Sequence, residues 1–255
     1  MTSTSPILEI EALSLATKSN ETLVDNVSFS LNKGESLGLV GESGSGKSLT
    51  LRAILGLLPH GVRQTGGVIK SEVSSAMVFQ DPRGALDPLC PVVRQLAEVV
   101  YFRQKVSRKA SRMVALELLE MLGLPDSLKR TDRYPSQLSG GQCQRIVIAI
   151  ALACKPGILL CDEPTTALDV TVQRQIMDTI ARLQQELGFA MVFVTHNLAV
   201  AAAMCSKLAV MKKGQIVEHG NTLNVLQNPQ NPYTQMLINS VLPLPELEGS
   251  GQPWS

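Results

Sequence analysis

The chain has 255 residues, of which 44% are hydrophobic, and its formal net charge is +1. This length and apolar fraction suit one large α/β domain with a sizeable core, and the near-neutral charge does not favour a nucleic-acid-binding surface. The five cysteines include no Cys-x-x-Cys pair, so we expect buried thiols in a reducing compartment and neither a disulfide framework nor a zinc site.

The first third of the chain is predicted to form strands around one helix. The predicted strands, which alternate apolar and polar residues or are short and apolar, cover residues 7–13, 23–31, 36–40 and 76–80. A helical pattern over 48–58 follows a glycine-rich loop at 41–46 and ends before Pro59.

The rest of the chain is mostly helical and then alternates between strands and helices. Helices are predicted over residues 92–122, 139–153, 171–187 and 198–204. Strands are predicted over residues 158–161, 190–194, 208–211 and 215–218. Lys212-Lys213-Gly214 joins the last two strands as a hairpin.

Strands that alternate with helices predict a mainly parallel sheet covered on both faces. We expect a single domain over residues 1–243, with a helical subdomain inserted at about 81–138 and a flexible tail at 244–255. The start of the chain does not resemble a signal peptide, and its apolar runs are far shorter than the ~20 residues of a membrane helix. We therefore expect the chain to be soluble by itself.

One segment between a predicted strand and a predicted helix fits the phosphate-binding pattern G-x-x-x-x-G-K-[ST] without a mismatch: Gly41, Glu42, Ser43, Gly44, Ser45, Gly46, Lys47 and Ser48. Glycines let the backbone curl so that its N–H groups point at an anion, and the helix start, which includes Leu49, adds partial positive charge. We expect Lys47 to reach the β- and γ-phosphates of ATP and Ser48 to supply a hydroxyl to Mg²⁺. A glycine-rich turn without a ligand is the alternative, and the flanking elements disfavour it.

Two neighbouring acids, Asp162 and Glu163, end an apolar predicted strand. Buried carboxylates are costly unless a cation or hydrogen bonds compensate them. Asp162 therefore suits a Mg²⁺ shell, and Glu163 is placed to act as the general base that polarises the attacking water. The alternative is a solvated acidic turn before Pro164.

Four further motifs complete a set that resembles the ABC ATPase family. Ser139, Gly140, Gly141 and Gln142 resemble the signature motif, although a helix cap would explain them equally well by themselves. Gln80 resembles the Q-loop glutamine that contacts Mg²⁺, Asp169 in Ala167-Leu168-Asp169 resembles the D-loop aspartate, and His196 resembles the switch histidine near the γ-phosphate. An exposed amide, a helix N-cap and an unremarkable histidine are the respective alternatives.

The resemblance implies a P-loop NTPase core of ABC ATPase type, with an N-terminal antiparallel β subdomain and a helical subdomain. It also implies a head-to-tail pair of such subunits, identical or different, in which the signature of one closes over ATP held by the other. Two transmembrane permease subunits and, indirectly, a solute-binding protein would complete an assembly at the cytoplasmic face of the inner membrane. The docking surface is expected near residues 81–91, and no nucleic-acid partner is expected.

Within the family, the segments around 134–142, 162–171 and 228–234 resemble the peptide/nickel importer branch, and residues 48–65 resemble nickel-importer ATPases. Nickel, a metal–chelate complex or a peptide therefore remain open as the transported solute. No cysteine follows Cys205, so we expect no C-terminal iron–sulfur cluster. Residues 13–18 lack the aromatic residue on which the family usually stacks adenine, and how the base is held stays open.

Two other functions compete with an importer ATPase. A soluble ABC ATPase acting on ribosomes or DNA is disfavoured because the chain has one cassette, no inserted coiled coil and near-neutral charge. A non-catalytic ATP sensor is disfavoured by the presence of both Glu163 and His196.

Overall fold

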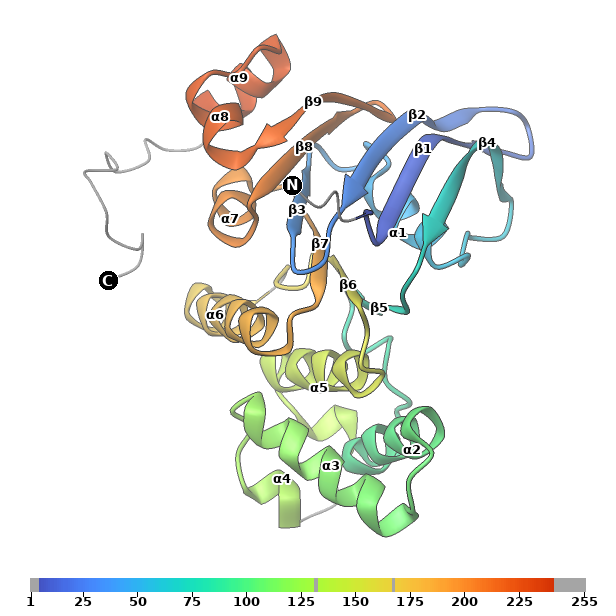
Figure 1. Ribbon diagram of the computed structural model, residues 1–255. Coiled ribbons are helices and arrows are strands. Elements are labelled where there is room, and N and C mark those ends of the chain that lie inside the picture. Colours follow the sequence, from blue (N-terminus) through green and yellow to red (C-terminus); the bar gives the residue numbers. More distant parts are fainter. Residues whose placement is uncertain (1–4, 131–132, 167, 241–255) are drawn as a thin grey trace. The chain divides into compact units, whose positions relative to one another are not determined.

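The computed structural model describes residues 5–130, 133–166 and 168–240, and these residues form two compact units (Figure 1). The first unit combines the described residues up to Glu72 with those from Ala190 onward, and the second runs from Val73 to Phe189. The expected tail at 244–255 and Ala167 of the expected D-loop lie outside the described residues.

The first unit contains a three-stranded antiparallel sheet in the order β2-β1-β4. Its strands are β1 (Leu8–Thr17), β2 (Thr22–Leu31) and β4 (Val62–Ser71). Leu8 and Ile10 of β1 are buried while Glu9 between them is more exposed, because successive side chains of a strand point to opposite faces. The expected N-terminal antiparallel subdomain is thereby confirmed.

A second sheet in the same unit carries the central strand β3 (Ser36–Val40) between β7 (Ala190–Thr195) and β8 (Lys207–Lys212). Both neighbours run parallel to β3, and β9 (Gln215–Asn221) pairs antiparallel with β8 as the expected hairpin. Every residue of β3 and β7 is buried, as near-continuous apolar runs in a parallel sheet require. The helices of this unit are α1 (Lys47–Ile54), α7 (Leu198–Met204), α8 (Thr222–Gln227) and α9 (Pro232–Ser240).

The second unit pairs β5 (Ser75–Val78) in parallel with β6 (Ile158–Asp162) and also contains helices. These are α2 (Val92–Gln104), α3 (Arg108–Met121), α4 (Ser127–Arg130), the 3₁₀ helix η1 (Pro135–Gln137), α5 (Gly140–Ala153) and α6 (Val170–Leu187). Most residues of α5 are buried, because it packs against α2, α3, α6 and β5 (Figure 1). The pairings β3–β7, β3–β8 and β5–β6 are thus parallel, as expected for the main sheet, whereas β8–β9 is antiparallel.

The structure differs from the sequence-based expectations in β4, in α1 and over residues 92–122, and it contains two helices, α8 and α9, that were not predicted. The strand β4 was not predicted, because only scattered apolar residues mark it and most of its side chains are exposed. Helix α1 ends at Ile54 and not at residue 58, since Gly56 adopts a left-handed φ of 68°. The helix expected over 92–122 is two helices, separated where Lys105 has a φ of 53° and Ser107 caps α3.

Within the described part of the chain, every helix is too short or too polar to cross a bilayer.

Candidate functional site

The phosphate-loop residues connect β3 to α1 in the first unit and adopt a tightly curled backbone. Gly44 and Gly46 have φ angles of 78° and 102°, a region that residues with a Cβ rarely occupy. A Cβ on Gly41 would collide with the carbonyl oxygen of Met211, so only glycine fits there. Helix α1 begins directly behind Gly46, and this N-cap residue makes no side-chain cap hydrogen bond. The loop therefore has the backbone form of an anion cradle.

Lys47 lies inside this loop and is only 4% exposed. Its ammonium donates to the carbonyl oxygens of Gly41 and Glu42 at 2.8 and 2.7 Å and to Ser45 Oγ at 3.4 Å. A buried cation at a helix N-terminus is favourable only beside such acceptors or an anion. This donor set fits the terminal phosphates of ATP.

The outer side of the loop is held by residues that sequence reasoning did not single out. Gly214, in the turn between β8 and β9, donates its N–H to the carbonyl of Ser45 at 3.0 Å. The backbone N–H of Glu42 donates to the hydroxyl of Tyr233 in α9 at 3.2 Å. The segment that contains Tyr233 was noted only as a mark of a family branch.

His196 follows β7 and is exposed. Val40 of β3 pairs with Thr195 of β7, so the phosphate loop and His196 leave neighbouring parallel strands at the same edge of the sheet. The fold of the first unit thus brings these two predicted motifs together, as the carboxyl ends of parallel strands do in open α/β sheets.

The acidic pair is placed in the second unit at the end of β6. Asp162 is 3% exposed, and Glu163 has a φ of 44°, which is uncommon for a residue with a side chain. The carboxylate oxygen Glu163 Oε2 accepts hydrogen bonds from Thr166 Oγ1 at 2.9 Å and from Gln80 Nε2 at 3.4 Å. Gln80 reaches it because β5 and β6 are parallel neighbours, with Val78 opposite Cys161.

Burial in this strand raises the pKa of the Cys161 thiol, and the adjacent Asp162 carboxylate raises it further. Cys161 is fully buried, so its thiol stays protonated and acts as a packing residue. Of the five free cysteines, Cys143, Cys161 and Cys205 are buried as expected, whereas Cys90 and Cys154 are only partly buried.

Ser139 and Gln142 form a reciprocal cap at the start of α5. Ser139 Oγ accepts from the Gln142 N–H at 3.2 Å, and Gln142 Oε1 accepts from the Ser139 N–H at 3.0 Å. A Cβ on Gly141 would lie 2.5 Å from Val172 Cγ1, so α5 and α6 approach closely at this glycine. The helix-cap alternative for this motif is therefore real, and it leaves a signature role open.

Arg83 connects the segment after Gln80 to the signature residues, since its Nη2 donates to the carbonyl of Leu138 at 3.1 Å. Asp169 is the N-cap of α6 and accepts from the Val172 N–H at 2.9 Å. The second unit therefore gathers Gln80, the acidic pair, the signature and Asp169, while the first unit gathers the phosphate loop and His196.

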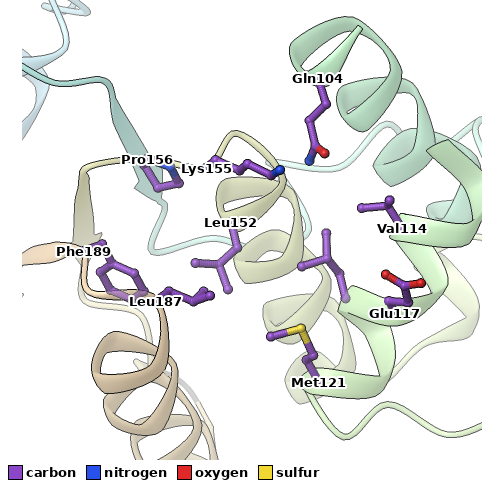
Figure 2. A pocket seen from close by; sticks show the side chains of 10 residues that line it. Gln104, Val114, Glu117, Met121, Leu152, Lys155, Pro156, Leu187 and Phe189 are labelled. Carbon is purple, nitrogen blue, oxygen red and sulfur yellow. The ribbon is translucent and has the colours of Figure 1, made fainter. Parts of the chain in front are cut away.

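The second unit also contains a cavity of about 460 Å³ (Figure 2). It is lined by apolar side chains such as Met121, Leu152 and Phe189, with Glu117 and Lys155 among them. Leu152 lies near the C-terminal end of α5, whereas the signature caps its N-terminus, and a helix of 14 residues is about 21 Å long. The cavity is therefore not part of the candidate site.

Comparison with known proteins agrees with the resemblance to the ABC ATPase family. The family model described as "ABC transporter" matches residues 24–166. The oligopeptide transport ATP-binding protein OppD of Bacillus subtilis is 40% identical over 96% of this chain and 74% of its own length. The dipeptide transport ATP-binding protein DppD of Haemophilus influenzae is 40% identical over 92% of this chain and 77% of its own length.

A solved structure gives the same answer for the fold. The dimeric post-hydrolysis state of the ATP-binding cassette MJ0796, bound to ADP and Pi, superposes with a TM-score of 0.73 at 30% identity, over 84% of this chain and 98% of that one. The match to the family model covers more than half of the chain, and the B. subtilis relative is matched over more than two thirds of its length. The chain belongs to the ABC transporter family, as one of its ATPases.

Proposed function

We propose that this chain is the ATP-hydrolysing subunit of an importer whose solute is a peptide. The observation that carries the ATPase part is the curled loop at the start of α1, in which a buried Lys47 ammonium lies against backbone carbonyls. The relatives named as oligopeptide and dipeptide transport ATP-binding proteins support the peptide. Nickel or a metal–chelate complex is the second candidate, which the resemblance of residues 48–65 supports.

The nucleotide phosphates are proposed to bind at the loop from Gly41 to Leu49. Backbone N–H groups and the positive end of α1 attract the anion, and Lys47 exchanges its carbonyl partners for phosphate oxygens. A loop without side chains at Gly44 and Gly46 allows the phosphates to approach the backbone. These contacts position the terminal phosphate for attack.

Mg²⁺ would neutralise the charge that develops on the phosphates. The oxygen donors that we assign to it are the hydroxyl of Ser48, the carboxylate of Asp162 and the side-chain amide oxygen of Gln80. These are hard ligands, as Mg²⁺ prefers, and it usually takes only one or two carboxylates besides phosphate and water. Asp162 is buried, which suits a carboxylate whose charge a cation compensates.

Glu163 is proposed as the general base. Its carboxylate accepts the proton of the attacking water while the bond from the water oxygen to the terminal phosphorus forms and the bond to the leaving oxygen breaks. Thr166 and Gln80 both bond to Glu163 Oε2, so the carboxylate is oriented before the reaction. His196 is proposed to contact the γ-phosphate.

The chain is proposed to act as a pair. In that arrangement Ser139, Gly140, Gly141 and Gln142 of one subunit, with Asp169, complete the nucleotide site of the other. The partner is a second copy or a related ATPase, and the pair docks peripherally on two permease subunits, at the cytoplasmic face of the membrane, with a solute-binding protein delivering the cargo. The capping box at Ser139 keeps this end of α5 rigid, which supports its use as a recognition surface.

The decisive test of catalysis is Glu163→Gln in the assembled transporter. The amide keeps the size of the side chain but cannot take a proton, so turnover should fall by about 10²- to 10⁴-fold while ATP binding is retained. ATP hydrolysis and binding of a fluorescent ATP analogue measure the two effects separately. Wild-type turnover in the variant would refute the base role.

The solute is tested in the same assembly reconstituted into vesicles. Radiolabelled peptides and ⁶³Ni²⁺, free or chelated, are offered from the side of the solute-binding protein. We expect peptide to stimulate ATP hydrolysis and to accumulate. Accumulation of nickel in place of peptide would decide for the second candidate.

A further inference from the structure

The segment that precedes α9 is fixed firmly to β9. The carboxylate of Glu218 accepts the backbone N–H of Gln230 at 2.8 Å and that of Asn231 at 3.0 Å. Asn231 Oδ1 in turn accepts the N–H of Tyr233 at 2.9 Å, as a cap at the start of α9. Two charge-assisted bonds to consecutive amides define the position of this segment. These hydrogen bonds therefore fix the position of the Tyr233 backbone.

The ring of Tyr233 is equally well fixed. The side chain is 4% exposed and belongs to a buried cluster that includes Val40, Ala201 and Val225. The Lys212 ammonium lies 4.4 Å from the ring centroid, within the range of a cation–π interaction. Val40 is the residue directly before the phosphate loop, so the ring and the loop share one packed core.

The hydroxyl of Tyr233 reaches the loop itself. The N–H of Glu42 donates to it at 3.2 Å, and the two residues are 191 positions apart in the chain. The carbonyl of the same Glu42 accepts the Lys47 ammonium at 2.7 Å. Glu42 is therefore hydrogen-bonded to Tyr233 through its backbone N–H and to Lys47 through its backbone C=O. Displacing Glu42 would displace an acceptor of the lysine.

We propose that Tyr233 is a positioning residue of the phosphate loop, which sets Glu42 and through it the place of Lys47. This inference rests on the proposed function, because it gives the C-terminal helix α9 a role in ATP affinity. Because Lys47 exchanges the Glu42 carbonyl for phosphate oxygens when ATP binds, Tyr233 acts on the loop before binding, and its loss weakens binding and not the chemical step. Burial raises the pKa of its hydroxyl, which keeps the group protonated and able to serve as a neutral hydrogen-bond partner.

The test is Tyr233→Phe in the full chain, which removes the hydroxyl and keeps the packed ring. The net value of one such bond, about 0.5–1.5 kcal/mol, corresponds to a rise of about two- to tenfold in the Kd of MgATP. Titration with a fluorescent ATP analogue measures the Kd, and hydrolysis by the assembled transporter should show the same rise in KM with kcat unchanged. Glu218→Gln, which weakens the anchor of the segment, should shift the Kd in the same direction.

Two matched variants separate positioning from general destabilisation. Val225→Ala loosens the same buried cluster without any bond to the loop, so it should lower the Tm and leave the Kd unchanged. Tyr101→Phe makes the same chemical change in α2 and should alter neither. An unchanged Kd in Tyr233→Phe, or an equal rise in Val225→Ala, would overturn the inference while leaving the proposed function intact. A wild-type chain that fails to bind ATP would overturn both.

Discussion

Thr166 offers a sharp test of how the proposed base is oriented. Its hydroxyl donates to Glu163 Oε2 at 2.9 Å, and Gln80 donates to the same atom at the longer distance of 3.4 Å. The substitution Thr166→Val removes the shorter bond and keeps the branched shape of the side chain. Of these two bonds, only the longer one would then remain.

The size of the effect follows from the geometry. A hydrogen bond to a charged group contributes about 1.5–3 kcal/mol when it is buried, and the exposed position of Thr166 reduces this to about 1 kcal/mol. Glu163 also has a φ of 44°, so relaxation of the backbone becomes favourable when the bond is lost. A misoriented base slows only the chemical step. We therefore expect kcat to fall about five- to tenfold, with no change in the KM for ATP.

Steady-state ATP hydrolysis in the assembled transporter is the assay. Thr166→Ser retains the hydroxyl and is the matched control, for which kcat should stay within about twofold of the wild type. If valine and serine gave equal rates, or if valine raised KM and left kcat unchanged, the orientation of Glu163 by Thr166 would be disproved.

Three further predictions concern other parts of the molecule. Gly41→Ala places a methyl group against the carbonyl of Met211. It should lower the free energy of unfolding by about 1–3 kcal/mol, measured by thermal denaturation, and weaken ATP binding at least tenfold, measured by titration. Burial raises the pKa of Glu218, but the nearby Thr234 hydroxyl and the bonds from the Gln230 and Asn231 amides together outweigh this and leave the pKa below its usual value. The stability that Glu218 contributes is therefore present above the unfolded pKa of about 4.3 and is lost as the pH falls through the lower folded value, so Glu218→Gln should flatten the acid limb of the unfolding free energy against pH. Leu89 is 86% exposed in a loop that Gln95 holds through three hydrogen bonds. Leu89→Ser should leave the Tm unchanged and reduce the stimulation of ATP hydrolysis by the permease subunits.

The local motifs are readable from the sequence because their chemistry is local. The residues from Gly41 to Ser48 are consecutive. The loop needs a left-handed backbone at Gly44 and Gly46, and glycines at these positions indicate it directly in the sequence. The apolar runs of β3 and β7 likewise indicate buried strands. These local features are sufficient to indicate the fold class and the family.

Other elements gave weak local signals. β4 pairs along β1 although its side chains are mostly exposed, so backbone hydrogen bonds and not an apolar pattern define it. The short helices α8 and α9 depend on caps and on packing against the β8–β9 region, which no periodicity reveals.

Which distant residues meet depends on the fold of the whole chain. Gln80 touches Glu163 because β5 and β6 are neighbours, and Tyr233 touches Glu42 across 191 positions of the chain. The order of parallel strands is a non-local choice, fixed by how whole layers bury their apolar faces. For that reason the sequence by itself identified the phosphate loop, while the groups that orient its lysine and the proposed base became visible only in the folded chain.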